Sequence, residues 1–180
     1  MSIITNVRTI RLEQFPNSIW VEIETDENLT GLGEAWRGTA AIETIIHHDI
    51  CPWLIGQDSR NIELISRTLL TPYVGFHSAS AEIRAASAID IALWDLAGKR
   101  HGIPVYEALG GASRSSIQVY NTCSGYSFNA SSSAYNSGTS RRMITDKDEM
   151  RGPYDDQVAF TRDAGALAKS LLSEGYKIMK

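Results

Sequence analysis

AASAIDIALWDLAGKRHGIPVYEALGG, residues 85–111, is the stretch of this chain that decides the fold. Its apolar residues recur at spacings of three and four, which is typical of one face of an amphipathic helix. The residues of this face are Ala85, Ala86, Ile89, Ala92, Leu93 and Leu96. Three of the six are alanines, so we expect the helix to approach its neighbour closely.

The end of this helix is also encoded. Three basic residues at 99–101 suit the negative end of the helix dipole. Gly102 can adopt the left-handed conformation that ends helices, and Pro104 prevents continuation. The helix is therefore predicted to end just before Gly102. Asp95 and Lys99, four residues apart, are predicted to pair on its solvent side.

The composition is that of an ordinary globular protein, with 180 residues, 43% hydrophobic, 21% charged and a net charge of −4. No apolar run approaches the roughly 18 residues of a membrane helix, and the N-terminal sequence lacks the apolar core of a secretory signal. We therefore expect a cytoplasmic protein without a membrane partner. The absence of a basic cluster argues against nucleic acid and favours a small-molecule partner. Cys51 and Cys123 are predicted to be packed thiols.

The first part of the chain is predicted to be an α+β unit. Alternation and turn residues predict a three-stranded antiparallel meander from the segments 3–12, 19–25 and 32–35. One helix is expected to run from an N-cap at Thr39 to Trp53, and another from about Ser59 to Leu70. His47, His48 and Asp49 are expected at the surface, because adjacent helical residues do not chelate a metal together. Strands followed by helices favour an α+β class up to about residue 115.

The second part follows a different pattern. Residues 116–122 and 176–180 are predicted strands, joined by a helix over 155–174 that ends at Gly175. The apolar face of that helix is predicted to comprise Phe160, Ala164, Leu167, Ala168 and Leu171. A connection this long implies a parallel pair with a right-handed crossover, which needs further strands beside it. The loop over 124–151 is predicted to be a lid, or alternatively a plain surface loop.

The order of residues within 85–111 resembles the enolase superfamily, in its mandelate racemase and muconate lactonizing branch. The resemblance rests on AIDxALWDLxGK (88–99), GxPVY (102–106) and LGG (109–111), and on ETDENLTGLGEA (24–35) and LIGQD (54–58) upstream. It implies an N-terminal capping domain over 1–115 and the start of a (β/α)7β TIM-like barrel over 116–180, truncated after its second strand. Gly31-Leu32-Gly33 also lacks the third glycine of a dinucleotide-binding motif.

The resemblance implies an enzyme that removes the proton α to a carboxylate. Members of the family bind a divalent metal, usually Mg²⁺, through carboxylates on the third, fourth and fifth barrel strands, so we expect the Mg²⁺ ligands beyond Lys180 and assign no metal ligand in this chain. The family's base motif, Lys-x-Lys, matches with Lys180 as its first lysine. The resemblance makes Lys180 a catalytic residue that acts electrostatically near the substrate carboxylate, and places the proton-abstracting base two residues later.

Substrate specificity in this family lies on two loops of the cap, which correspond here to 15–18 and 35–38. The candidate substrate-binding residues are Phe15, Asn17, Trp36, Arg37 and, at the end of the first barrel strand, Asn121. Arg37 could hold a substrate carboxylate or hydroxyls, and Trp36 could shield the site from water. Alternatively, Trp36 only packs and Arg37 is solvated.

The polar second loop and the long hydrophilic connection favour an acid sugar as substrate, and hence a dehydratase, a hydro-lyase. A racemase, epimerase or cycloisomerase using the same enolate remains an alternative, because fold does not fix reaction. A second alternative is a non-catalytic fragment that acts as a folding or dimerisation module. The 180-residue chain alone is expected to be inactive, and the complete protein is expected to be a homo-oligomer.

Overall fold

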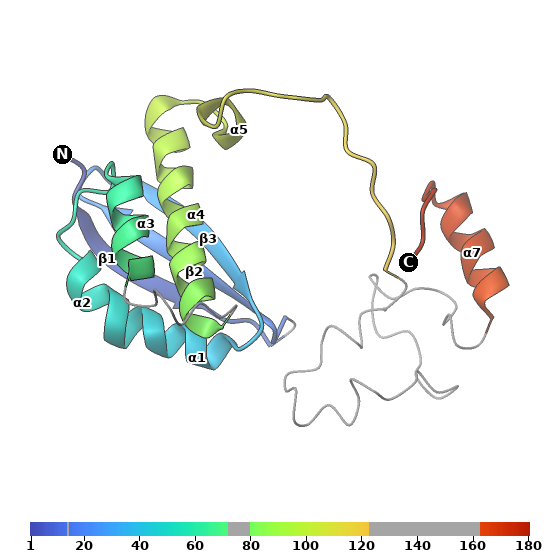
Figure 1. Ribbon diagram of the computed structural model, residues 1–180, viewed down its shortest axis with the longest axis horizontal. Coiled ribbons are helices and arrows are strands. Elements are labelled where there is room, and N and C mark those ends of the chain that lie inside the picture. Colours follow the sequence, from blue (N-terminus) through green and yellow to red (C-terminus); the bar gives the residue numbers. More distant parts are fainter. Residues whose placement is uncertain (14, 72–79, 123–162) are drawn as a thin grey trace. The chain divides into compact units, whose positions relative to one another are not determined.

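A computed structural model describes residues 1–13, 15–71, 80–122 and 163–180 of the chain (Figure 1). The chain divides into two compact units, residues 1–13 with 18–113 and residues 14–17 with 114–180. No helix in the described ranges is long and apolar enough to cross a membrane.

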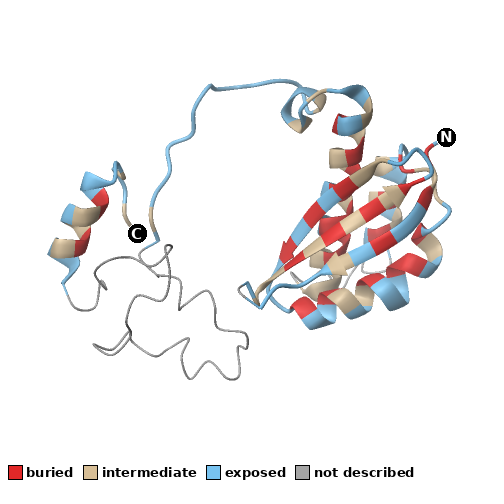
Figure 2. Cartoon of the chain, turned by 180° about the vertical axis from the view of Figure 1, so that it is seen from behind, coloured by how far each residue is buried: buried red, intermediate tan, exposed pale blue. Residues whose placement is uncertain are grey.

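The first unit contains the predicted meander. Strands β1 (Ile4–Ile10), β2 (Ser18–Thr25) and β3 (Thr30–Trp36) form an antiparallel sheet in the order β1-β2-β3. Every second residue of β2 is buried, as the alternation predicts (Figure 2). Asn28, in the turn between β2 and β3, has a φ of 58°, a left-handed conformation that asparagine tolerates better than most residues. The α+β prediction for this part is confirmed.

The long helix α4 (Ala81–His101) packs on one face of the sheet (Figure 1). All six residues of the predicted apolar face are buried. The approach is close because β3 presents glycines to it: a Cβ at Gly31 would lie 2.1 Å from the Ala92 carbonyl oxygen, and one at Gly33 would lie 1.9 Å from that of Ala88. Because these two glycines lack a Cβ, α4 can pack directly against the backbone of β3.

The predicted end of α4 is confirmed. Gly102 has a φ of 66°, and the Ile103 N–H donates to the Gly98 carbonyl at 3.0 Å. Pro104 then occupies the N-cap position of a short helix, α5 (Val105–Ala108), which the sequence reasoning missed.

The predicted Asp95–Lys99 pair forms at 2.8 Å, with both side chains partly exposed to solvent. Asp95 Oδ2 also accepts a hydrogen bond from the Leu32 N–H at 2.7 Å, and Lys99 Nζ donates to the Thr30 carbonyl at 2.7 Å. Both groups belong to β3, an edge strand of the sheet. The pair therefore binds backbone groups that an edge strand would otherwise leave open to another chain.

A continuous helical segment follows β3: α1 (Thr39–Thr44), the π-helical turn η1 (Ile45–Ile50) and α2 (Cys51–Leu54). The predicted N-cap, Thr39, is wrong, because the left-handed Gly38 occupies that position and Thr39 is the first helical residue. A segment ending at Leu54 agrees with the predicted end at Trp53 to within one residue.

The spacing of buried residues explains the π-helical turn. Four buried residues of this segment are spaced four apart: Ile42, Ile46, Ile50 and Leu54. Residues four apart on an α-helix drift around the axis by about 40° per step. The wider turn, in which the Cys51 N–H donates to the Ile46 carbonyl, counteracts that drift. It therefore keeps the four side chains on the side of the core.

Helix α3 (Ile62–Leu70) begins three residues after the predicted start at Ser59, with Asn61 at the N-cap. Ser59 is withdrawn from the helix because its N–H donates to the Ser2 carbonyl at 2.8 Å, and its side chain is fully buried. Arg100, in the last turn of α4, donates to Ser59 Oγ at 2.9 Å, to Ser2 Oγ at 2.7 Å and to Glu27 at 3.1 Å. This polar network ties the first residues to the end of α4.

The second unit contains less regular structure. Helix α7 (Ala164–Ser173) is capped by Asp163, whose side chain accepts from the Ala166 N–H at 2.8 Å, and Gly175 follows it with a φ of 97°. Leu167 and Leu171 are buried as predicted, whereas Ala164 is exposed. The predicted helix over 155–174 is wrong in its start, because Asp163 is extended and caps a helix that begins at Ala164. Phe160, the predicted lid over 124–151 and Cys123 lie outside the described residues.

The two predicted barrel strands are reduced to one parallel bridge, between Asn121 and Met179. The prediction of full strands over 116–122 and 176–180 is therefore wrong for the described structure. Two parallel strands without neighbours on either side have little to stabilise them. Their parallel direction agrees with the prediction.

Candidate functional site

The candidate catalytic lysine lies at the strand end where the parallel bridge forms. The Lys180 N–H donates to the Asn121 carbonyl at 2.9 Å, and the Asn121 N–H donates to the Ile178 carbonyl at 3.1 Å. The Lys180 ammonium lies 5.8 Å from the centroid of the Tyr120 ring. The structure therefore brings Lys180 and Asn121 together through their backbones.

Their side chains lie on opposite faces of the strand pair. Asn121 is bridged to Met179, so these two residues share one face, and successive residues of an extended strand alternate. Lys180 consequently shares its face with Tyr120, as the ring contact shows. Sequence reasoning missed Tyr120 because the register of two strands far apart in the sequence cannot be read from either strand alone.

The second candidate group lies where β3 ends. Trp36, the last residue of β3, is 47% exposed, and the Arg37 guanidinium lies 4.5 Å from the centroid of its ring. Arg37 has a φ of 64°, which is unfavourable for a residue with a side chain. Its carbonyl accepts a hydrogen bond from Arg84 Nη1 at 3.1 Å. Arg84, on α4, thereby ties the left-handed turn to the helix.

The connection between β1 and β2 carries the other two candidate residues. Phe15 is 38% exposed, and Asn17 is half-buried. Ser18 begins β2 directly opposite Trp36, so this connection and the Arg37 turn leave the sheet at the same end. The binding roles of Phe15, Asn17, Trp36 and Arg37 remain predictions.

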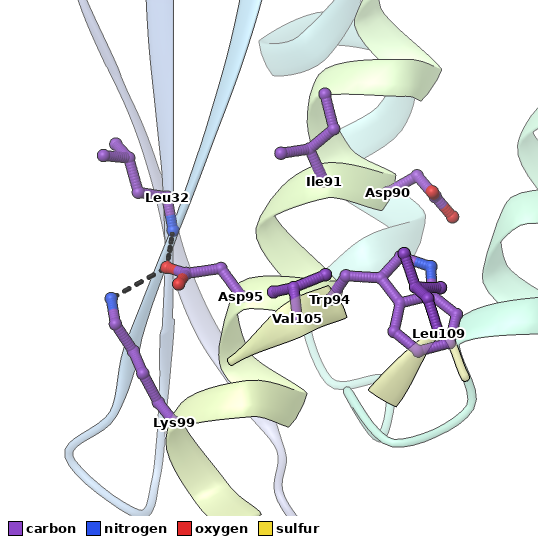
Figure 3. Close-up of a pocket in the computed structure, with 8 residues that line it drawn as sticks. All are labelled: Leu32, Asp90, Ile91, Trp94, Asp95, Lys99, Val105 and Leu109. Carbon is purple, nitrogen blue, oxygen red and sulfur yellow. Dashed lines mark hydrogen bonds and ion pairs between the residues drawn. The ribbon is translucent and has the colours of Figure 1, made fainter. Parts of the chain in front are cut away.

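A hollow of about 700 Å³ lies elsewhere in the first unit, between β3, α4 and α5 (Figure 3). It is lined by Leu32, Asp90, Ile91, Trp94, Asp95, Lys99, Val105 and Leu109, and it includes none of the candidate residues. Its charged side chains are already engaged: Asp95 lies between Lys99 and the Leu32 N–H, and Asp90 accepts from Ser66 Oγ. We therefore assign no catalytic role to this hollow.

No group of three His, Cys, Asp or Glu side chains in the described part of the chain could hold a metal ion. The described residues therefore offer no Mg²⁺ site. His47 and His48 are exposed, as predicted, and His47 Nε2 lies 2.8 Å from Thr9 Oγ1. Cys51 is a buried free thiol, as predicted, and burial raises its pKa, which disfavours the reactive thiolate.

The perturbed carboxylates lie in the polar network of the first unit. Hydrogen bonds from Arg60 hold the pKa of Asp58 well below its usual range. Hydrogen bonds from Ser2 and then Arg100 lower the pKa of Glu27. Since both groups hold segments of the cap together, their shifts indicate a structural role.

Comparison with known proteins identifies the family. Residues 6–110 match the mandelate racemase / muconate lactonizing enzyme, N-terminal domain. Two curated relatives are the D-mannonate dehydratase of Rhizorhabdus wittichii, 36% identical over 126 residues, and the D-galactonate dehydratase of Ralstonia nicotianae, 39% identical over 124 residues. Each alignment covers 68% of this chain and 31% of the relative, so this chain spans about a third of the length of these relatives.

Solved structures of the same superfamily are also similar to this chain. An enolase protein from environmental sequencing of the Sargasso Sea has a TM-score of 0.74 and 47% identity, covering 99% of this chain and 39% of that one. A mandelate racemase/muconate lactonizing protein from Paracoccus denitrificans PD1222, complexed with magnesium, has a TM-score of 0.61 and 30% identity. The match covers 68% of this chain and 34% of that one. The chain therefore belongs to the mandelate racemase and muconate lactonizing enzyme family of the enolase superfamily, and its first unit is the family's capping domain.

Proposed function

We propose that this chain is part of an acid-sugar dehydratase. The observation that carries the proposal is that the relatives named above are dehydratases of D-mannonate and D-galactonate, at 36% and 39% identity. Because the chain spans about a third of their length, the activity is proposed for the full-length protein. The cytoplasmic location and the homo-oligomeric state remain predictions.

Lys180 is the residue of this chain to which we assign a catalytic role. Its ammonium would lie close to the substrate carboxylate and stabilise the negative charge that develops there when the α-proton leaves. The base that takes this proton is expected two residues beyond Lys180. As the β-carbon loses its hydroxyl group, the electron pair of the broken C–H bond becomes the new carbon–carbon double bond. The departing hydroxide takes up a proton and leaves as water.

Arg37 is proposed to bind the substrate carboxylate or hydroxyls. Its guanidinium lies over the Trp36 ring, 4.5 Å from the centroid. A guanidinium has five N–H donors, so it can contact a ring and still form a bidentate contact with a carboxylate. Trp36 would exclude water beside it. Phe15 and Asn17, on the connection between β1 and β2, are proposed as further substrate contacts. Asn121, at the end of the first predicted barrel strand, lies on the face opposite Lys180, so we do not assign it to the substrate that Lys180 would contact.

Mg²⁺ is the proposed cofactor, with its ligands beyond Lys180. When bound, the ion would supply a fixed positive charge for the developing oxyanion. A family structure in complex with magnesium supports this choice of ion.

The proposal is tested on the full-length gene product, with its sequence read beyond codon 180. We expect Mg²⁺-dependent release of water from an acid sugar such as D-mannonate or D-galactonate, and no turnover by residues 1–180 alone. Lys180→Met should lower kcat at least about 100-fold, as expected for a group that stabilises the transition-state charge. Lys177→Met is the matched control and should change kcat less than about twofold, because Lys177 is exposed and lies on the other face of the strand. Full activity in Lys180→Met would contradict the assignment.

Two alternatives are separated by the same preparation. A racemase or epimerase would exchange the α-proton for deuterium in D₂O without losing a hydroxyl group, which proton NMR of the substrate detects. A stop codon directly after Lys180 would instead favour a folding or dimerisation module. In that case, the 180-residue protein should self-associate and show no metal-dependent turnover.

A further inference from the structure

We propose that Tyr120 is a positioning residue for Lys180: its ring holds the lysine ammonium at the strand end without neutralising its charge. The proposal rests on the proposed function, because it presupposes that Lys180 acts on the substrate carboxylate.

The register of the strand pair sets up the contact. A parallel bridge joins Asn121 to Met179. Tyr120 precedes Asn121 and Lys180 follows Met179, so both project from the opposite face of the strand pair. The Lys180 Nζ then lies 5.8 Å from the ring centroid, within the roughly 6 Å over which a ring attracts a cation. Tyr120 is 50% exposed in the described structure.

The chemistry of the partner matters. Lysine carries a point charge on a flexible four-carbon stem, so an unsupported ammonium samples many positions. A carboxylate could fix it, but would also cancel much of its attraction for an anionic substrate. Among the described residues, Lys180 forms no ion pair. An aromatic face restricts the ammonium while leaving its full charge available.

The other face of the strand pair provides a contrast. Asn121 and Met179 lie there, and neither can compensate for the loss of the Tyr120 ring beside Lys180. The ring, and not the phenolic hydroxyl, is the part that the proposal requires. A phenylalanine at position 120 should therefore retain the contact with the Lys180 ammonium, whereas an aliphatic residue should lose it.

The contact is tested by NMR of the full-length protein with labelled lysine, in which the Lys180 signal is identified by its loss in Lys180→Arg. The methylene protons next to Nζ should be shifted upfield by the Tyr120 ring current. This shift should persist in Y120F and disappear in both Y120L and Y120M; the second aliphatic variant guards against a folding defect in the first. Tyr176→Leu, which removes a ring from the same segment as Lys180, is the matched control and should leave the shift unchanged.

Kinetics test the positioning role. Y120L and Y120M should lose about 2- to 30-fold in kcat/KM, the range expected from the strength of a cation–ring contact, while Y120F retains the wild-type value. Equal losses in Y120F and Y120L, or an unchanged lysine signal in Y120L, would overturn the role of the ring. If Y120L stays fully active while Lys180→Met is inactive, the Tyr120 proposal alone fails. If Lys180→Met is active, both the proposed catalytic role of Lys180 and the Tyr120 proposal fail.

Discussion

The two units of this chain differ in how they bury their apolar residues. In the first, the inward residues of β2 and the alanine face of α4 are buried in one core. In the second, Ile117 and Val119 are 74% and 60% exposed, and Leu167 and Leu171 are the buried apolar residues among those described there. The cap therefore supplies its own core, whereas the segment with the candidate catalytic lysine relies on further strands for its packing.

The strongest test of this difference compares two Gly→Ala substitutions. Gly33→Ala should destabilise the protein by about 3 kcal/mol or more, because the new Cβ would lie 1.9 Å from the Ala88 carbonyl oxygen and force α4 off the sheet. Gly165→Ala, within α7, should change stability by less than about 1 kcal/mol, since its nearest neighbour is the Asp163 side chain at 3.3 Å and alanine favours helix. The free energy of unfolding from urea titration measures both. Equal effects would show that the first unit is packed no more tightly than the second.

Arg100→Met tests the polar part of the cap. The substitution removes the donor to Ser2, Ser59 and Glu27 and leaves two fully buried serine side chains short of a partner, so we expect a loss of about 2 to 3 kcal/mol. Arg67→Met removes the exposed pair with Glu63 on α3, and should cost only about 0.5 kcal/mol. A small loss in Arg100→Met would mean that water replaces the network.

The network should also make stability depend on pH in a defined direction. Glu27 and Asp58 have pKa values below their ordinary values of 4.5 and 3.8. A group with a lowered pKa in the folded state contributes fully above its ordinary pKa and loses that contribution as the pH falls through the lowered one. Urea unfolding should therefore show stability declining below about pH 4.5, less steeply in Arg100→Met, where Glu27 has lost one of its partners. An unchanged slope in that variant would contradict the assigned cause.

The parts of the fold that the sequence predicts are those fixed by neighbouring residues. The apolar face of α4, its end at Gly102 and the alternation of β2 depend on spacings of a few residues, and the structure confirms them. The late start of α3 does not follow from such patterns. It depends on Ser59 meeting Ser2 and Arg100, residues that are 57 and 41 positions away.

The candidate site shows the same limit. Lys180, Arg37 and Trp36 could be nominated from short motifs, because the family pattern places them. The ring beside Lys180 could not, since Tyr120 is remote in sequence and only the strand register brings it to the same face. The left-handed φ of Arg37 is likewise invisible in the sequence, where the following Gly38 is the expected site of such a conformation.

Arg37 offers the smallest and most specific test of the comparison, because it is a site candidate carried by the well-packed unit. A left-handed conformation costs a residue with a side chain roughly 1 kcal/mol, so Arg37→Gly should be neutral or stabilising by up to about that amount, offset in part by the lost contact with Trp36. The same variant should raise KM for the acid sugar in the full-length enzyme. Arg84→Met, which removes the hydrogen bond to the Arg37 carbonyl but keeps the guanidinium of Arg37, should raise KM less. Thermal unfolding measures the effect of Arg37→Gly on stability, and steady-state kinetics measure its effect on KM. A variant that is more stable but has a raised KM would show that the strained Arg37 conformation serves substrate binding. A variant with unchanged KM would show that this conformation belongs to the turn alone.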